Sequence, residues 1–205
     1  RWLVWDGKCW VVDTTGEVMR RAKATVQAIY AEAAQLAEEN ERAAVAKWAM
    51  KSEACTRLRA MIELAQSEPE IPVLPEQLDV NPWLLNVQNG TLDLKTGTLR
   101  THRREDLITK LAPVAYDPNA VCPIWLHFLD RIMNHNQALI GFLQRAFGYA
   151  LTGDTTEQVL FFCYGAGANG KSTLLETFRG VLGRDYAQQT PTETLLVKAR
   201  SGGIP

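Results

Sequence analysis

The hydrophobic residues at the start of the chain flank a turn sequence. Residues 2–12 are mostly hydrophobic, with Asp6-Gly7 in their middle. Because Asp-Gly supplies the positive φ angles of a type I′ turn, this pattern predicts a β-hairpin with a two-residue turn. We expect its three tryptophans to pack in a core. Stacking on nucleic-acid bases is the alternative, although no arginines are interleaved with them.

Hydrophobic residues then recur at helical spacing over residues 18–36 and again over residues 45–65. Thr14 and Glu17 have the spacing of a capping box, and Pro69 ends the second pattern. We predict two long helices that form an antiparallel hairpin, with the charged residues between the hydrophobic stripes in solvent. The stripes are Val18, Ala22, Val26, Ile29, Ala33 and Leu36, followed by Val45, Trp48, Cys55, Leu58, Ile62 and Ala65.

Prolines mark a connector over residues 72–82, and two turn sequences interrupt residues 84–101. These turns, Asn89-Gly90 and residues 95–97, predict a small antiparallel meander. Basic residues gather where the meander ends. A contact with a phosphate backbone and an ordinary solvated surface are both open there, because nearby acidic residues offset the charge. The basic cluster consists of Arg100, His102, Arg103 and Arg104.

Helical spacing returns over residues 124–132 and 139–150, and a nearly unbroken apolar run follows at residues 158–164. Such a run is typical of a strand buried on both faces of a parallel sheet. A further helical pattern begins near Leu174 and ends at Gly183. We place a domain boundary near Cys122 and Pro123, which divides the chain into residues 1–122 and residues 123–205.

Between the apolar run and the last helix lies Gly-Ala-Gly-Ala-Asn-Gly-Lys-Ser, which fits Gly-x-x-x-x-Gly-Lys-[Ser/Thr]. The glycines allow positive φ angles and a close approach, so that backbone N–H groups converge on phosphate oxygens. Lys171 brings a charge to the β- and γ-phosphates, and the Ser172 hydroxyl ligates the Mg²⁺ between them. The pattern predicts binding of ATP and Mg²⁺ by Gly165, Ala166, Gly167, Ala168, Asn169, Gly170, Lys171, Ser172 and Thr173.

Composition narrows the class of protein. A hydrophobic content of 46% in 205 residues is enough for one large packed domain or two small ones. The formal net charge of -1 excludes an overall basic field, so a contact with nucleic acid would need a local patch. The four cysteines are scattered and the three histidines lack metal-ligand spacing. We expect a reduced, cytoplasmic protein without a membrane span or signal peptide.

Four segments carry a resemblance to a known family. They are residues 81–94 (Asn-Pro-Trp-Leu-Leu-Asn-Val-Gln-Asn-Gly-Thr-Leu-Asp-Leu), residues 103–110, residues 148–153 (Gly-Tyr-Ala-Leu-Thr-Gly) and residues 167–173. In these segments the chain resembles the phage and plasmid primase group, which joins a poxvirus primase-like N-terminal module to a superfamily 3 helicase. The resemblance implies an α+β N-terminal module followed by a truncated P-loop α/β (AAA+-like) core with a helical lead-in.

The same resemblance implies a function. Members of this group are ring-forming ATPases that translocate on DNA during replication of a phage, plasmid or integrated element. It assigns Lys171 the catalytic role of stabilising charge on the transferred phosphoryl group and Ser172 that of holding Mg²⁺. Because the chain begins with Arg1 rather than Met, we expect it to be part of a longer protein. We expect that whole protein to form a homo-oligomeric ring on DNA, and this piece alone to be monomeric.

Hydrolysis by such helicases needs further parts: an acidic residue at the end of a later strand, a polar sensor and an arginine from a neighbouring subunit. After the P-loop helix the apolar run is residues 195–197, and Lys198 rather than a carboxylate follows it. We therefore expect this chain alone to be nearly inactive as an NTP hydrolase.

Two other classes stay open. A P-loop kinase uses the same loop, although kinases usually carry it near the N-terminus, and here a whole domain precedes it; phosphotransfer to small alcohols would identify one. Residues 1–122 show no nucleophile, acid–base pair or metal cluster. They therefore suit a non-catalytic module for DNA docking or assembly, which crosslinking would identify.

Overall fold

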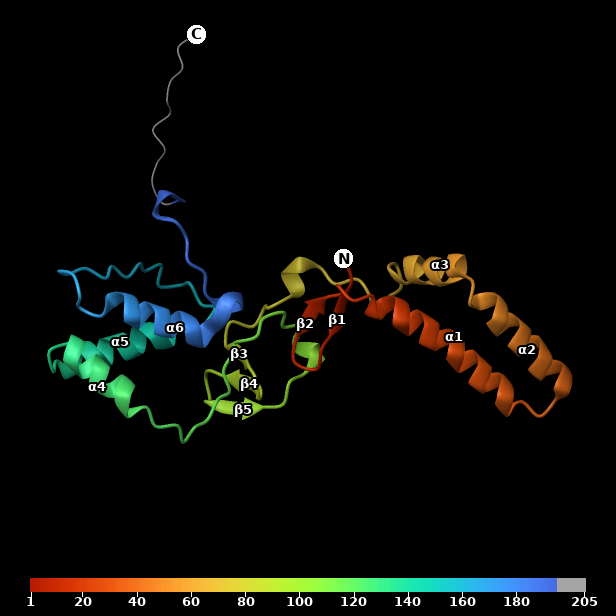
Figure 1. Ribbon diagram of the computed structural model, residues 1–205, viewed down its shortest axis with the longest axis horizontal. Helices are drawn as coiled ribbons and strands as arrows, with labels where there is room; N and C mark the ends of the chain where they lie inside the picture. The colour runs from red at the N-terminus through yellow and green to blue at the C-terminus, as the bar shows by residue number, and fades with distance from the viewer. Residues whose placement is uncertain (195–205) are drawn as a thin grey trace, which may run out of the picture. The chain divides into compact units, whose positions relative to one another are not determined.

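A computed structural model describes residues 1–194, and these residues contain six α-helices and five short strands (Figure 1). The chain divides into two compact units. Unit 1 comprises Arg1–Val80 and Arg103–Thr109, and unit 2 comprises Asn81–His102 and the residues from Lys110 onward. Short 3₁₀ turns connect larger elements at Pro75–Gln77 and Arg104–Asp106, and a third, Thr192–Thr194, follows α6.

Unit 1 begins with the predicted hairpin. Strand β1 (Leu3–Trp5) pairs antiparallel with β2 (Trp10–Val12), and Trp5 lies opposite Trp10. The predicted two-residue turn is wrong, because four residues connect the strands. The Asp6 carboxylate accepts hydrogen bonds from the N–H groups of Lys8 at 2.7 Å and Cys9 at 2.8 Å, and this stabilises the longer loop. The tryptophans are half-buried rather than fully in a core.

Three helices make up the rest of unit 1: α1 (Glu17–Gln35), α2 (Glu39–Ser52) and α3 (Cys55–Ala65). The predicted antiparallel pairing of the first two is confirmed (Figure 1). The prediction of one continuous helix over residues 45–65 is wrong. The chain is extended at Ala54, with ψ at 132°, and this residue separates α2 from α3. This break turns α3 back toward α1, so that Leu58 packs with Ala22 and Val26 in one buried cluster.

The predicted capping box at Thr14 was also wrong. Helix α1 begins at Glu17, and it is the Asp13 carboxylate that accepts the N–H groups of Glu17 and Val18, each at 2.9 Å. These bonds satisfy two of the donors that the first turn of a helix leaves free. They also lower the pKa of Asp13, chiefly through the bond from Val18, because hydrogen bonds to the ionised carboxylate favour the charged form.

Unit 2 contains the predicted meander, with β3 (Leu84–Val87), β4 (Gly90–Asp93) and β5 (Thr98–Arg100) in that order and antiparallel. Gly90 follows the tight turn with φ at 158°. A Cβ added to Gly90 would overlap the Arg100 carbonyl oxygen, so the close approach of β5 requires glycine there.

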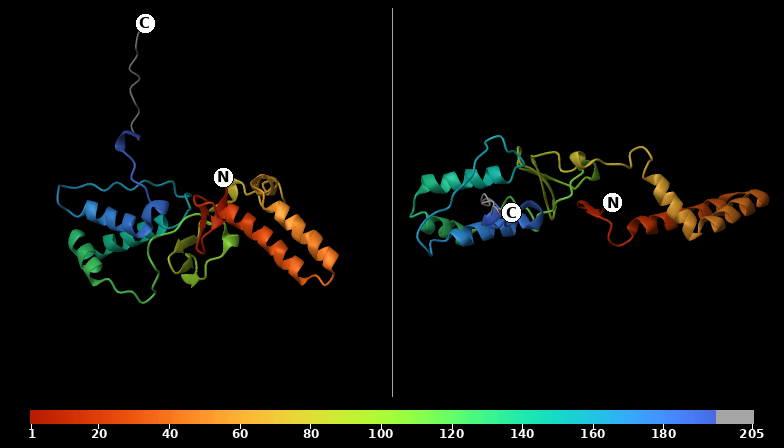
Figure 2. Two further views of the ribbon diagram at one scale, coloured as in Figure 1. Left: turned by 45° about the vertical axis from the view of Figure 1, so that its right-hand side comes forward. Right: turned by 90° about the horizontal axis from the view of Figure 1, so that it is seen from above.

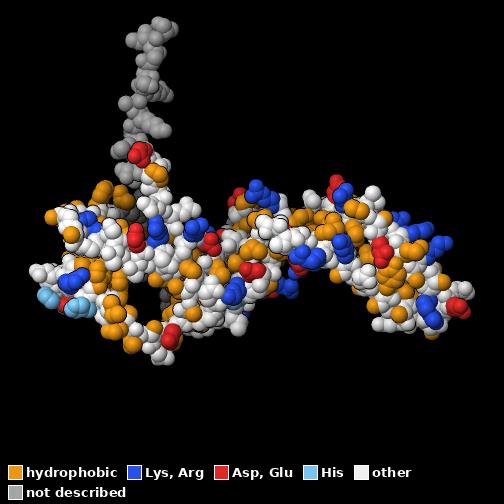
Figure 3. Space-filling view, in the orientation of Figure 1, with side chains coloured by type: hydrophobic (Ala, Val, Ile, Leu, Met, Phe, Trp, Pro, Cys, Tyr) orange, Lys and Arg blue, Asp and Glu red, His pale blue; other side chains and the backbone are white. Residues whose placement is uncertain are grey.

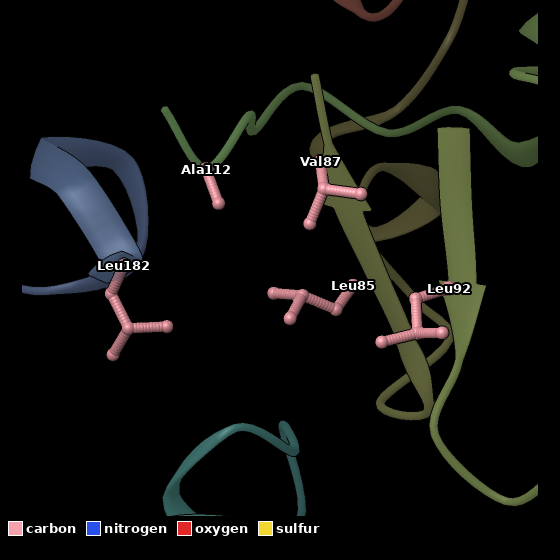
Figure 4. Packing of buried hydrophobic residues seen from close by; sticks show 5 residues of the cluster. All are labelled: Leu85, Val87, Leu92, Ala112 and Leu182. Carbon is pink, nitrogen blue, oxygen red and sulfur yellow. The ribbon is translucent and has the colours of Figure 1, made fainter. Parts of the chain in front are cut away.

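Helices α4 (Pro123–Ile132), α5 (Gln137–Ala150) and α6 (Lys171–Tyr186) complete unit 2 (Figure 2). All three were predicted from their spacing. A buried cluster of Leu129, Ile140 and Leu174 joins one residue from each helix. A second cluster joins the meander to α6 through Leu85, Val87, Leu92, Ala112 and Leu182 (Figure 4). The compact units therefore do not divide after residue 122, where the sequence places a boundary between modules; that boundary stays a prediction.

The predicted buried strand at residues 158–164 is wrong for the structure described. This segment has no strand conformation, and its large side chains are exposed, Phe162 at 82% and Tyr164 at 93%. A parallel strand gains its stability from neighbouring strands on both sides. No strand within residues 1–194 pairs with residues 158–164. The P-loop α/β core stays a prediction. The apolar run at residues 195–197 lies outside the described residues.

Candidate functional site

The predicted phosphate-binding loop lies immediately before α6. Its last glycine, Gly170, is the N-cap of the helix and has left-handed backbone angles, φ 82° and ψ 0°. Gly165 has φ at 144°, and Ala168 also has a positive φ, 57°. Glycine takes such angles at little steric cost because it has no Cβ atom, so Gly165 and Gly170 suit these positions.

Lys171 is the first residue of α6, and its side chain folds back over the loop. The ammonium nitrogen Nζ lies 2.6 Å from Asn169 Oδ1, 3.2 Å from Gly165 O and 3.5 Å from Ala166 O. These three acceptors surround one cation on a half-buried residue. All of them are neutral oxygens, so a phosphate oxygen offered at the same place would be a stronger acceptor for this ammonium.

The N-terminus of α6 points its donors toward the same loop. The N–H groups of Lys171, Ser172 and Thr173 have no acceptor inside the helix, because they belong to its first turn. The helix dipole adds partial positive charge at this end, and the side chains of Ser172 and Thr173 are exposed. Helix donors and the lysine therefore converge on one exposed segment and favour an anion.

Helix α4 packs against the last residue of the loop, Gly170. A Cβ placed on Gly170 would lie 2.7 Å from Ile132 Cγ2 and 3.2 Å from Phe128 Cε2. One turn further on, the buried Leu174 packs with Leu129 of the same helix α4. The start of α6 is thus held by hydrophobic packing, while the residues before Gly170 are exposed.

The nine predicted site residues, 165–173, are consecutive in the chain. Within them, the Lys171 side chain contacts Gly165 and Asn169 of the loop. The upstream flank differs from expectation, since Phe161 is exposed and makes an edge-on ring contact with Phe142 of α5, with centroids 6.1 Å apart. Figure 3 shows hydrophobic side chains at the surface over this part of unit 2. Within residues 1–194, no cluster of three or more His, Cys, Asp or Glu side chains could hold a metal. The Mg²⁺ role of Ser172 therefore rests on the loop pattern.

Two residues of the basic cluster at the end of the meander make contacts inside their own units. His102 turns inward, with its Nδ1 2.8 Å from Asn86 Oδ1. Arg104 pairs with Glu105 at 3.2 Å and accepts, through its carbonyl oxygen, the Trp10 indole N–H at 2.8 Å. Arg104 therefore has a structural role within unit 1.

Sequence reasoning missed a polar network inside unit 2. Asn86 and Thr91 are each only 1% exposed, and the Thr91 hydroxyl donates to Asn86 Oδ1 at 3.0 Å. The signal was available, because Asn86 interrupts an apolar stretch in the middle of a strand. A buried amide needs partners, and its partners come from segments distant in sequence.

Comparison with known proteins identifies the class of the N-terminal region. Residues 1–134 match the family described as "D5 N terminal like". The match spans the hairpin, the helices of unit 1, the meander and α4. The chain therefore belongs to the D5 N terminal like family. The predicted phosphate-binding loop follows the matched region.

Two curated viral proteins are similar to this chain. One is "Putative helicase 121R" of Invertebrate iridescent virus 3, 26% identical over 131 residues, which cover 61% of this chain and 14% of that protein. The other is "Putative helicase L207/L206" of Acanthamoeba polyphaga mimivirus, 27% identical over 119 residues, covering 56% of this chain and 12% of that protein. The alignments thus span only a small part of either relative. In the described part of this chain, no helix is long and apolar enough to cross a membrane.

Proposed function

We propose that this chain is part of a replication helicase of a virus, phage, plasmid or integrated element, and that its loop at residues 165–172 binds ATP with Mg²⁺. The family and the two relatives named as helicases support the replication role. The loop pattern and its position at the start of α6 support the nucleotide.

One observation carries the nucleotide part of the proposal. Lys171 Nζ lies 2.6 Å from Asn169 Oδ1 and 3.2 Å from Gly165 O, at the helix end where Gly170 takes its left-handed conformation. A lysine, a helix N-terminus and a glycine turn thus converge on one loop. Each of them favours phosphate oxygens, and together they match the chemistry of a triphosphate.

The roles of individual side chains follow from this geometry. Lys171 would exchange its neutral loop acceptors for oxygens of the β- and γ-phosphates, and the backbone N–H groups at the start of α6 would donate to the same chain of phosphates. The Ser172 hydroxyl would serve as a Mg²⁺ ligand. Hydrolysis in ring helicases also requires an arginine from a neighbouring subunit, so we expect binding by this chain without appreciable turnover.

Titration calorimetry with Mg-ATP on residues 1–205 tests the nucleotide part. Lys171→Ala should abolish measurable binding, because it removes the cation while an alanine still suits the first helical position. Lys47→Ala is the matched control: it removes the same charge from an exposed position of α2 and should bind like the wild type. Equal affinity of wild type and Lys171→Ala would exclude this loop as the binding site.

The helicase part needs the intact protein. We expect DNA-dependent ATP hydrolysis and strand separation by the complete polypeptide, and loss of both in Lys171→Ala. Transfer of phosphate to small alcohols instead of water would favour a kinase. Nucleotide binding without DNA-dependent hydrolysis in the intact protein would contradict the helicase assignment.

A further inference from the structure

Helix α6 is held at both ends, by different parts of unit 2. Its N-terminal end, which carries Lys171, packs on α4 through Gly170 and Leu174. Its C-terminal end packs on the meander, where Leu182 lies in one buried cluster with residues of β3 and β4 (Figure 4). The meander belongs to the family-matched region, residues 1–134, and the loop does not. Helix α6 is therefore a physical link between the two.

Two hydrogen bonds fasten the C-terminal end of α6. The backbone N–H of Asn86, in β3, donates to the Tyr186 hydroxyl at 3.1 Å. The backbone N–H of Leu111 donates to Asp185 Oδ2 at 3.0 Å. The Tyr186 hydroxyl in turn lies 3.5 Å from the carbonyl oxygen of Lys110. Backbone groups of two separate segments thus meet side chains of the last turn of the helix.

Asn86 is the centre of this attachment. It is 1% exposed, and its Oδ1 lies 3.0 Å from the Thr91 hydroxyl and 2.8 Å from His102 Nδ1. Its Nδ2 donates to the Lys110 carbonyl at 3.0 Å, and its own carbonyl accepts the Ala112 N–H at 2.9 Å. A buried, multiply bonded amide resists displacement, because every bond lost inside the protein leaves a desolvated polar group. The surface that Tyr186 contacts is therefore rigid.

We propose that Asn86 and Tyr186 are positioning residues for the nucleotide loop, acting through α6; this inference rests on the proposed function. The helical segment from Lys171 to Leu182 is a rod about 18 Å long at 1.5 Å per residue. Tilting such a rod by about 5° displaces its far end by about 1.5 Å. A displacement of that size at Lys171 is enough to weaken contacts with phosphate oxygens, whose geometry is exacting.

The test compares two tyrosines that pack against the same hydrophobic cluster. Tyr186→Phe removes the hydroxyl that Asn86 uses and keeps the ring, over which Lys110 Nζ lies at 5.9 Å. Tyr116→Phe is the matched control, because the Tyr116 hydroxyl makes no hydrogen bond within residues 1–194. Asp185→Ala removes the second attachment, the carboxylate that accepts from Leu111, and provides an independent variant.

Hydrogen exchange of the nucleotide-free chain is the first measurement. In Tyr186→Phe and Asp185→Ala we expect amide exchange to rise about fivefold at residues 84–87 and 110–112 and also at the distant residues 174–176, the first amides of α6 that have an acceptor inside the helix. Tyr116→Phe should leave all three segments unchanged. Faster exchange confined to residues 84–87 and 110–112 would overturn the proposal, because the attachment would then be local packing without influence on the loop.

Mg-ATP titration of the same variants is the second measurement. We expect the Kd to rise about fivefold in Tyr186→Phe and to stay unchanged in Tyr116→Phe. An unchanged Kd in Tyr186→Phe, with a binding wild type, would also overturn the positioning role. If the wild type binds no nucleotide, the proposed function fails, while the exchange at residues 174–176 still decides whether the meander positions the start of α6.

Discussion

Gly183 of α6 lies directly against the ring of Pro113, which follows the meander. A Cβ built on Gly183 would stand 2.5 Å from Pro113 Cδ, and the glycine itself has φ at 70° and ψ at -174°, outside the helical region. The helix therefore kinks where the proline approaches, and the kink turns Asp185 and Tyr186 toward the meander. The last turn of α6 therefore leaves the rod that carries Lys171 at this contact.

Gly183→Ala tests this contact. Because the added methyl group meets the proline at a positive φ angle, we expect a loss of about 2–4 kcal/mol in the stability of unit 2. Gly180→Ala, on the same helix, has open space around its Cβ and should gain about 0.5–1 kcal/mol, since alanine favours the helix. Thermal unfolding by calorimetry separates the two. Equal melting temperatures of Gly183→Ala and Gly180→Ala would mean that the approach of Pro113 to Gly183 does not affect stability.

The buried amide gives a second prediction. Asn86→Ala removes the side-chain partner of the Thr91 hydroxyl, of His102 Nδ1 and of the Lys110 carbonyl, so we expect a loss of about 3 kcal/mol. Thr91→Val removes one of these bonds at nearly constant volume and should cost about 1–2 kcal/mol. Asn119→Ala, in an exposed loop, is the control and should change stability by less than about 0.5 kcal/mol. A loss in Thr91→Val equal to that in Asn86→Ala would show that the amide is not the centre of the network.

Asp13 predicts a pH dependence at the start of α1. Its pKa lies below the ordinary aspartate value of about 3.9, because Val18 and Glu17 donate to the ionised carboxylate. A group with a lowered pKa stabilises the folded state above its unfolded pKa, and this stabilisation is lost as the pH falls through the folded value. We expect the Val18 amide resonance to titrate with a midpoint below about 3.9, and Asp13→Asn to remove that titration. A midpoint at or above the ordinary value would contradict the capping role.

The glycines of the candidate phosphate loop predict different outcomes at two positions. Gly170→Ala places a methyl group against Ile132 and Phe128 at a positive φ angle, so it should disturb the packing of α4 on the loop and abolish Mg-ATP binding. Gly167→Ala meets nothing within 4 Å and has no positive φ, so the nucleotide-free protein should keep its melting temperature. Calorimetric unfolding and titration of both variants check this. A stable, nucleotide-binding Gly170→Ala would show that α4 does not support the loop.

Local patterns predicted most of the helices and strands. Helical spacing identified α1, α4, α5 and α6, and turn residues identified the hairpin and the meander, because each of these elements is specified by neighbours a few residues away. The loop at residues 165–172 was likewise visible from its spacing alone. The turn prediction and the capping prediction were wrong for the same reason. In each case an aspartate carboxylate, Asp6 in the hairpin loop and Asp13 before α1, accepts hydrogen bonds from nearby backbone N–H groups.

The sequence by itself thus determined the two sets of paired strands, the helices α1, α4, α5 and α6 and the identity of the candidate phosphate loop. The hydrophobic stripes were right only in part, because Trp48 and Ile124 are exposed and Ala49 is the buried residue of α2. Only the tertiary structure decided that the second helical pattern breaks at Ala54, that residues 158–164 form no strand among the described residues, and that Asn86 meets Tyr186 across 100 positions of sequence. The physical reason is the range of the interactions. Spacing, turns and caps act within a few residues, whereas strand pairing and buried hydrogen bonds depend on which distant segments the folded chain brings together.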